Sequence, residues 1–127
     1  MNDKGQKGRI AEEIALGFLI DRGLVLLDRN WRWGHRELDL VMKGGCGYGK
    51  NDVLHIVEVR SLYEPCCQMP VETVDKKKRR MVISAASGYV KVHGIDFETR
   101  FDIVSVLFST DGTYKLEYYP DAFTPEW

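Results

Sequence analysis

Apolar side chains near the start of the chain recur with the spacing of a helix. Between residues 8 and 22 they are separated by steps of three and four residues, which places them on one face. Gly23 follows and supplies the usual helix stop. On this predicted helix Glu12 falls within or beside the apolar arc, whereas Glu13 lies further round, nearer solvent. Glu12 is therefore an acidic side chain at the edge of a buried face.

Five strands and a second helix are predicted in the rest of the chain. Alternation of apolar and polar side chains indicates a strand, and an apolar stripe preceded by an aspartate indicates a capped helix. Stretches rich in glycine or proline, or in aromatic and basic side chains, are interpreted as connections. The strands are predicted over residues 24–28, 37–42, 53–60, 101–108 and 114–119, the helix over 75–92, and the main connections over 30–36, 43–52 and 61–73.

The order of these elements predicts an α/β fold. One helix precedes three strands, and a second helix leads to another strand and a final hairpin strand. Because the second helix must connect the first hairpin to a further strand, a mixed β-sheet flanked by α-helices, one on each face, is the economical arrangement. A chain of 127 residues without internal repeats has room for one hydrophobic core, so we expect a single domain over residues 1–127.

Composition narrows the class of protein. The shares of 44% hydrophobic and 29% charged residues are typical of a globular protein and exclude a disordered or fibrous chain. No apolar run reaches the roughly 18 residues that a membrane span needs, and the first nine residues lack the apolar segment of a signal peptide. We therefore expect a cytoplasmic protein without a membrane partner.

The three cysteines make a poor framework for disulfides or zinc. Cys66 and Cys67 are adjacent, and Cys46 is distant from both. An odd number suits no disulfide framework, and structural zinc prefers paired ligands at fixed spacing. We expect reduced thiols without a metal.

Positive charge is concentrated although the net charge is only −1. Five consecutive cations open the second predicted helix, and such a cluster can hold phosphates. Lys78 differs from its neighbours because it lies one turn before Val82, on the stripe that faces the core. The simpler alternative is a solvated helix start. The candidates for nucleic-acid binding are Arg32, which lies between two tryptophans, and Lys76, Lys77, Arg79 and Arg80.

Two acids lie on strands that are predicted to pair. If residues 37–42 and 53–60 form a hairpin, Asp39 and Glu58 can project from the same face, although the sequence does not fix the register. Two buried carboxylates repel, and a hard divalent cation such as Mg²⁺ would compensate. Arg60 follows on the side of Glu58, where it could stabilise transition-state charge or simply pair with that glutamate. The alternative for the acids is the polar face of a hairpin.

Several short motifs follow one another in order between Gly8 and Phe123. They are AEEIALGFLIDRG (11–23), NWR (30–32), RELDLV (36–41), IVEVR (56–60), VDKKKRRM (74–81), RFDIVSV (100–106) and DAF (121–123). Together they resemble the YraN-like family of small bacterial proteins. That family is predicted to have a restriction-endonuclease-like fold, an αβββαβ core plus a C-terminal strand, and is regarded as distantly related to Holliday-junction resolvases.

The resemblance implies a nuclease site. Asp39 and Glu58 match the metal-binding acids of the family, and Glu12 matches an acid that the first helix brings to the site. The implied function is hydrolysis of phosphodiesters by a water activated by Mg²⁺ or Mn²⁺, with branched or structured DNA as substrate. Junction-resolving relatives often act as homodimers, which leaves the oligomeric state open.

Arg60 departs from the family pattern, which has a lysine at this position. Lysine can lose a proton when its pKa is depressed, but arginine stays protonated and cannot be a general base. If the family lysine mainly supplies charge, Arg60 preserves activity, with Lys78 as a further cation in the site. Otherwise the protein is a nucleic-acid-binding module without efficient cleavage, or a protein-interaction domain that kept the fold.

Overall fold

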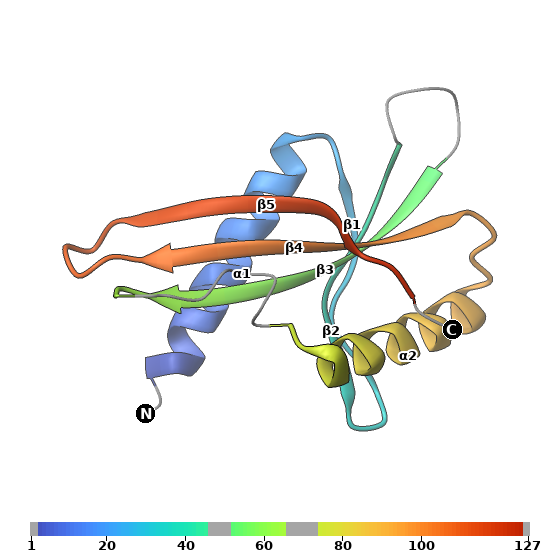
Figure 1. Cartoon of the computed structure of the whole chain (residues 1–127). Helices are drawn as coiled ribbons and strands as arrows, with labels where there is room; N and C mark the ends of the chain where they lie inside the picture. Colours follow the sequence, from blue (N-terminus) through green and yellow to red (C-terminus); the bar gives the residue numbers. More distant parts are fainter. Residues whose placement is uncertain (1–2, 46–51, 66–73, 126–127) are drawn as a thin grey trace.

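Helices and strands follow one another in the expected order. The computed structural model describes residues 3–45, 52–65 and 74–125, and Figure 1 shows the arrangement. The elements are α1 (Asp3–Asp21), β1 (Val25–Trp33), β2 (Arg36–Gly45), β3 (Asp52–Tyr63), α2 (Lys76–His93), β4 (Glu98–Phe108) and β5 (Tyr114–Phe123). The three cysteines, and with them the expected state of their thiols, lie outside the described residues.

One mixed sheet contains the five strands in the order β1-β2-β3-β4-β5. Neighbouring strands are antiparallel except for β3 and β4, which are parallel. A parallel pair needs a crossover connection, and α2 lies on that connection. The α/β fold with a mixed sheet, predicted from the element order, is thus confirmed.

The two helices cover opposite faces of the sheet (Figure 1). On one face, Ala11, Ala15 and Leu19 of α1 pack against a buried layer that includes Leu40 and Val57. On the other face, α2 buries residues including Val82, Ala85 and Tyr89 against residues including Leu54 and Ile56. Asp75 caps α2, as its position predicted, because its Oδ1 accepts a hydrogen bond of 2.8 Å from the backbone amide of Lys78. No described helix combines the length and apolar character needed to cross a membrane.

All three predicted connections were too long because strands continue into them; at residues 43–52, β2 continues to Gly45 and β3 begins at Asp52. Residues 30–33 belong to β1, although Asn30 has a left-handed φ of 52° inside the strand. Trp31 packs against the α2 core. This tertiary contact keeps the segment in the sheet, although its aromatic and basic residues had predicted a connection. Likewise β3 continues to Tyr63, past the predicted end of its strand.

The alternation of side chains along β2 is interrupted at Asp39. Leu38 packs in the α2 layer, whereas Leu40 and Met42 pack in the α1 layer. Strict alternation along residues 37–42 would place all three side chains on one face, and the structure departs from it at Leu38. Pairing between β2 and β3 ends at Leu40 and Val57, after which β3 continues alongside β4 and β2 alongside β1. The two strands part at Asp39, and this fork positions the candidate site.

Candidate functional site

The carboxylate of Asp39 connects β2 to β3 at the point where the two strands separate. Its Oδ2 accepts a hydrogen bond from the backbone amide of Val59 at 2.9 Å. The bond begins where the regular pairing of the two strands ends, one step beyond Leu40 and Val57. A side chain thus takes over an amide that a continuing ladder would have paired. This contact fixes the orientation of Asp39 beside Glu58, the neighbour of Val59.

Glu58 is a buried carboxylate whose oxygens make no well-formed hydrogen bond among the described residues. Its exposed fraction is 0%, and neither of its side-chain oxygens has a hydrogen-bond partner. The Nζ of Lys78 lies 3.4 Å from Oε1, which is an ion-pair distance without the geometry of a hydrogen bond. Burying a carboxylate with so few partners is costly. The site therefore has negative charge that its own side chains compensate incompletely.

Protonation reflects this imbalance. Burial, and after it the charge of Asp39, raises the pKa of Glu58 to about 8 against the opposing charge of Lys78. The pKa of Asp39 is also raised, mainly by burial, against the Val59 hydrogen bond and the charges of Lys78 and Arg60. Metal-free protein at neutral pH thus favours a proton on Glu58. A bound cation would take the place of that proton.

Glu12 approaches the same acids from α1. Its side chain is 17% exposed and lies 4.0 Å from Arg29, which forms a closer ion pair of 2.7 Å with Glu13. Burial, followed by the charge of Asp39, raises the pKa of Glu12, so the two carboxylates influence each other. Across the described ranges, no three His, Cys, Asp or Glu side chains lie close enough to enclose a metal by themselves. Glu12 is near the pair without completing a cage of three acids.

Two cations accompany the acids. Lys78 reaches Glu58 from the first turn of α2, as its place on the core-facing stripe suggested. Arg60 is half-buried on β3, and its charge lowers the pKa of Asp39. The structure thus brings together the five candidates that sequence had assigned to the chemistry, which are Glu12, Asp39, Glu58, Arg60 and Lys78.

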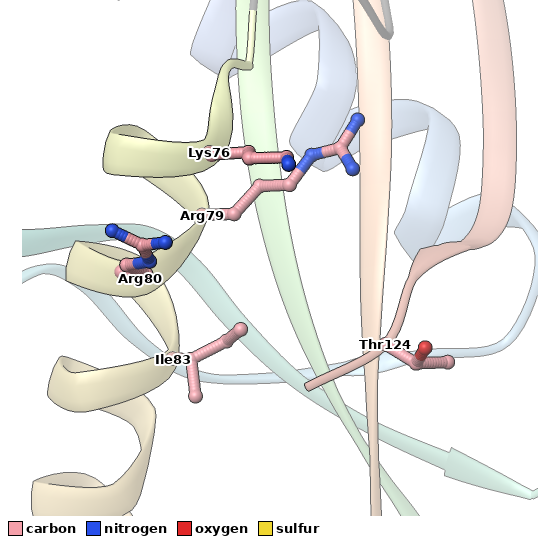
Figure 2. A pocket seen from close by; sticks show the side chains of 5 residues that line it. All are labelled: Lys76, Arg79, Arg80, Ile83 and Thr124. Atoms are coloured by element: carbon pink, nitrogen blue, oxygen red, sulfur yellow. The ribbon is translucent and has the colours of Figure 1, made fainter. Parts of the chain in front are cut away.

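The basic residues at the start of α2 are divided between two directions. Lys76, Arg79 and Arg80 line a shallow hollow with Ile83 and Thr124. Figure 2 shows Lys76 and Arg79 extending toward the sheet, while the guanidinium of Arg80 points elsewhere. Arg79 also has structural contacts, because its Nε donates to the carbonyl of Val74 at 2.9 Å and its guanidinium lies 5.5 Å from the ring centre of Phe123.

The remaining nucleic-acid candidates are more isolated. Lys77 is exposed on α2 and Arg32 is exposed on β1. Strand alternation places Arg32 opposite to Trp31 and Trp33, which approach α2. The structure therefore does not bring Arg32 into the same surface as the basic residues of α2.

Sequence reasoning missed Asn30. With its amide turned so that the nitrogen donates, this nitrogen lies 3.3 Å from Oε1 of Glu12 and 3.1 Å from Oε1 of Glu37. The left-handed backbone of Asn30 directs it there, and asparagine tolerates that conformation better than most residues. An asparagine beside the tryptophans was the available signal, but it also suits a turn. Asn30 links the helix acid to β2.

A small α/β protein with a buried acid pair at the fork of two central strands is the class that these features define. The sequence profile of the uncharacterised protein family UPF0102 matches residues 11–106, a range that contains Glu12, both strand acids and all of α2. The chain belongs to this family. Membership agrees with the resemblance to YraN-like proteins.

Bacterial relatives match almost the whole chain. A UPF0102 protein of Porphyromonas gingivalis is 39% identical over 124 residues, which cover 97% of this chain and 87% of the relative. One of Bacteroides thetaiotaomicron is 34% identical over 125 residues, covering 98% of each chain. One of Anaeromyxobacter dehalogenans is 40% identical over 117 residues, covering 91% of this chain and 82% of the relative.

Proposed function

We propose that this protein is a metal-dependent nuclease that hydrolyses phosphodiesters in branched or otherwise structured DNA. The observation that carries the proposal is Glu58, a fully buried carboxylate whose oxygens make no well-formed hydrogen bond among the described residues. Asp39 is fixed beside it by the Val59 amide. A chain that buries two acids in this way compensates them most simply with a cation.

The acid pair suits magnesium or manganese. Asp39 and Glu58 would hold the ion, and two carboxylates are sufficient because Mg²⁺ usually keeps several waters and also binds substrate phosphate. When bound, such an ion supplies positive charge to the phosphoryl group and lowers the pKa of a water. The lack of a third acid in the cluster, within the described ranges, is compatible with this donor set, whereas it would not suit a closed cage for calcium.

Lys78 has the role that the family gives to a strand lysine. It enters from α2 rather than from β3, yet its Nζ lies 3.4 Å from Glu58. Unlike Arg60, a lysine can both stabilise negative charge and exchange a proton. Arg60 then needs only to bind phosphate or stabilise a developing anion, which a guanidinium does well.

DNA is positioned by the basic start of α2. Lys76, Arg79 and Arg80 surround one hollow, and Lys78 on the same turn contacts Glu58. Contacts to phosphates fix the position of a duplex without reading its sequence. The phosphate-binding cations and the acids therefore share one element, so DNA held by α2 lies beside Glu58.

The test is cleavage of branched, flapped, single-stranded and duplex DNA with Mg²⁺, Mn²⁺ or EDTA. We expect metal-dependent cleavage of at least one substrate, and its loss in Asp39→Asn and Glu58→Gln, which preserve side-chain shape. Asp21→Asn, which changes an exposed acid at the end of α1, is the matched control and should cleave normally. Cleavage that persists in both site variants would refute the assignment of the acids.

A binding module without cleavage is the second candidate, and Arg60 is the residue that favours it. If this arginine impairs proton transfer, wild-type protein binds DNA but cleaves it poorly, and Arg60→Lys restores cleavage. If Lys78 supplies the proton chemistry, Arg60→Lys leaves an active enzyme about as active as before. A loss of activity in Arg60→Lys would instead show that the guanidinium has a geometry that lysine cannot replace.

A further inference from the structure

The outer side of α2 carries a second hollow, distinct from the acid pair. It has a volume of about 430 Å³ and is lined by Trp33 from the β1–β2 hairpin and by residues of α2, namely Arg80, Ile83, Ser84, Ser87, Gly88 and Lys91. Arg80 and Ile83 also line the hollow at the start of α2, so the two hollows adjoin each other. We call the surface formed by Trp33, Arg80, Ser84, Ser87 and Lys91 the α2 groove.

Trp33 is held in this groove by a close approach to the helix backbone. A Cβ added at Gly88 would lie 2.6 Å from the indole, so the ring lies directly against α2 at a residue without a side chain. Trp31 stacks beside it with ring centres 5.6 Å apart and planes inclined by 11°. Despite these contacts Trp33 is 40% exposed. The ring is thus rigidly presented, which lowers the entropy cost of stacking against a ligand.

The charges of the groove suit an anion. Arg80 and Lys91 are exposed, and the lining contains no carboxylate among the described residues. Neither cation forms an ion pair within the described part of the chain, whereas Lys78 is engaged with Glu58. Two serine hydroxyls between the cations can donate further hydrogen bonds. The combination of an exposed indole with separated cations is what stacking of a base and contacts to flanking phosphates require.

We propose that the α2 groove binds a single-stranded segment of nucleic acid, with an unpaired base stacked on Trp33 and its phosphates held by Arg80 and Lys91. A duplex hides the faces of its bases and would use only the cations, so the tryptophan favours a single strand. Arg80 and Lys91 are separated by eleven residues, or about 16 Å along the helix axis, so they would contact different phosphates of the strand. The proposal rests on the nuclease function and names its substrate class as DNA with an unpaired arm that leads to the acids.

The test is binding of labelled oligothymidylate, measured by fluorescence anisotropy in EDTA so that cleavage plays no part. We expect Trp33→Ala to weaken binding about tenfold, and Trp33→Phe, which retains a ring, to bind more tightly than Trp33→Ala. The double variant Arg80→Ala/Lys91→Ala should lower the slope of log affinity against log salt by about 1.4, because each phosphate that a cation neutralises on a single strand contributes about 0.7. Lys115→Ala removes an exposed lysine of β5 and should change neither quantity.

Several results would contradict the proposal that the α2 groove binds a single strand. One is wild-type affinity and salt slope in both Trp33→Ala and Arg80→Ala/Lys91→Ala. Another is an equal loss of duplex binding in Trp33→Ala, and a third is equal competition by polyglutamate, which would make the groove a site for acidic peptides. If circular dichroism shows that Trp33→Ala is unfolded, the salt slope of the double variant decides. Because the assay contains no metal, it measures binding by the α2 groove independently of cleavage. The groove can therefore be confirmed even if the protein does not cleave DNA, and the two proposals can fail separately.

Discussion

At the scale of single residues, Glu58 is a costly side chain to bury, because its carboxylate has few partners to replace water. Its neighbours along β3 place it fully inside the core, while its carboxylate has only the 3.4 Å contact with Lys78 among the described side chains. Neutral glutamine would fill the same space at a smaller desolvation cost. That the chain places an acid here, facing another acid, is the residue-level reason for expecting a bound cation.

Stability should depend on pH through Glu58. Burial, together with the charge of Asp39, raises its pKa from 4.5 to about 8 in the folded protein, so the folded state holds this proton more tightly than the unfolded chain. In EDTA, the free energy of unfolding contributed by this group is complete below about pH 4.5 and falls by a few kcal/mol as pH rises through 8. Urea unfolding of Glu58→Gln should show a flatter dependence between pH 5 and 9 than wild type.

The matched control is Glu98→Gln, which changes an exposed carboxylate of β4 and should follow wild type. The shifts at Asp39 and Glu12 have the same sign, so Glu58→Gln reduces the dependence without abolishing it. Equal slopes for Glu58→Gln and wild type would show that Glu58 does not retain its proton in the folded state.

Lys78 should be required for cleavage in a way that an exposed lysine is not. Lys78→Met removes the cation beside Glu58, and we expect the rate to fall about 100-fold or more, the size of a general acid–base contribution. Lys115→Met should cleave normally. Lys78→Arg separates the two roles, because it restores charge but not proton exchange. Full activity of Lys78→Arg would assign Lys78 to charge stabilisation alone, and full activity of Lys78→Met would remove it from the site.

At the scale of elements, the packing of the β1–β2 hairpin on α2 depends on one helical glycine. Gly88 lies within α2, and Gly17 occupies a comparable position within α1. A Cβ at Gly88 would overlap the indole of Trp33, whereas a Cβ at Gly17 would have no heavy atom within 4 Å. Substitution by alanine should therefore change the stability of the protein in opposite directions at these two glycines.

We expect Gly88→Ala to destabilise the protein by about 1–3 kcal/mol, because the indole or the helix must move. Gly17→Ala should stabilise it by about 0.5–1 kcal/mol, since alanine favours a helix over glycine. Thermal unfolding followed by circular dichroism measures both. A stabilising Gly88→Ala would mean that Trp33 does not rest on the helix.

The elements also show what sequence could and could not predict. Both helices were predicted from local spacing, and the same spacing placed Lys78 toward the core. The continuation of β1 through Asn30 was not predictable, because contacts of Trp31 with α2 override a local pattern that suits a turn. Alternation identified Asp39 and Glu58 as candidates, but their meeting depends on the parting of β2 from β3, which is set by long-range pairing.

At the scale of the whole molecule, a divalent cation should act as a structural clasp between the hairpin and the rest of the sheet. Asp39 belongs to β2 and Glu58 to β3, so an ion held by both joins two strands that no longer pair directly at this point. Anything that binds only the folded state raises its stability. Metal binding is thus measurable apart from catalysis.

Mg²⁺ or Mn²⁺ at about 100 times its dissociation constant should stabilise wild-type protein by about 2.7 kcal/mol. The melting temperature should therefore rise with metal concentration, and differential scanning fluorimetry measures the shift. Asp39→Asn and Glu58→Gln should lose the response, whereas Asp21→Asn should retain it. A shift that is equal in all four proteins would locate the metal elsewhere.

The parallel pairing of β3 with β4 also determines how the sheet can assemble. The segment β1-β2-β3 and the pair β4-β5 are built from antiparallel neighbours in sequence, which can form locally, whereas β3 and β4 meet only after the chain has passed through α2. Loop-closure entropy opposes such distant contacts until they are made. Lys78 lies on this crossover and Glu58 on the strand that precedes it. The pairing of β3 with β4, which completes the sheet, therefore also brings Lys78 next to Glu58.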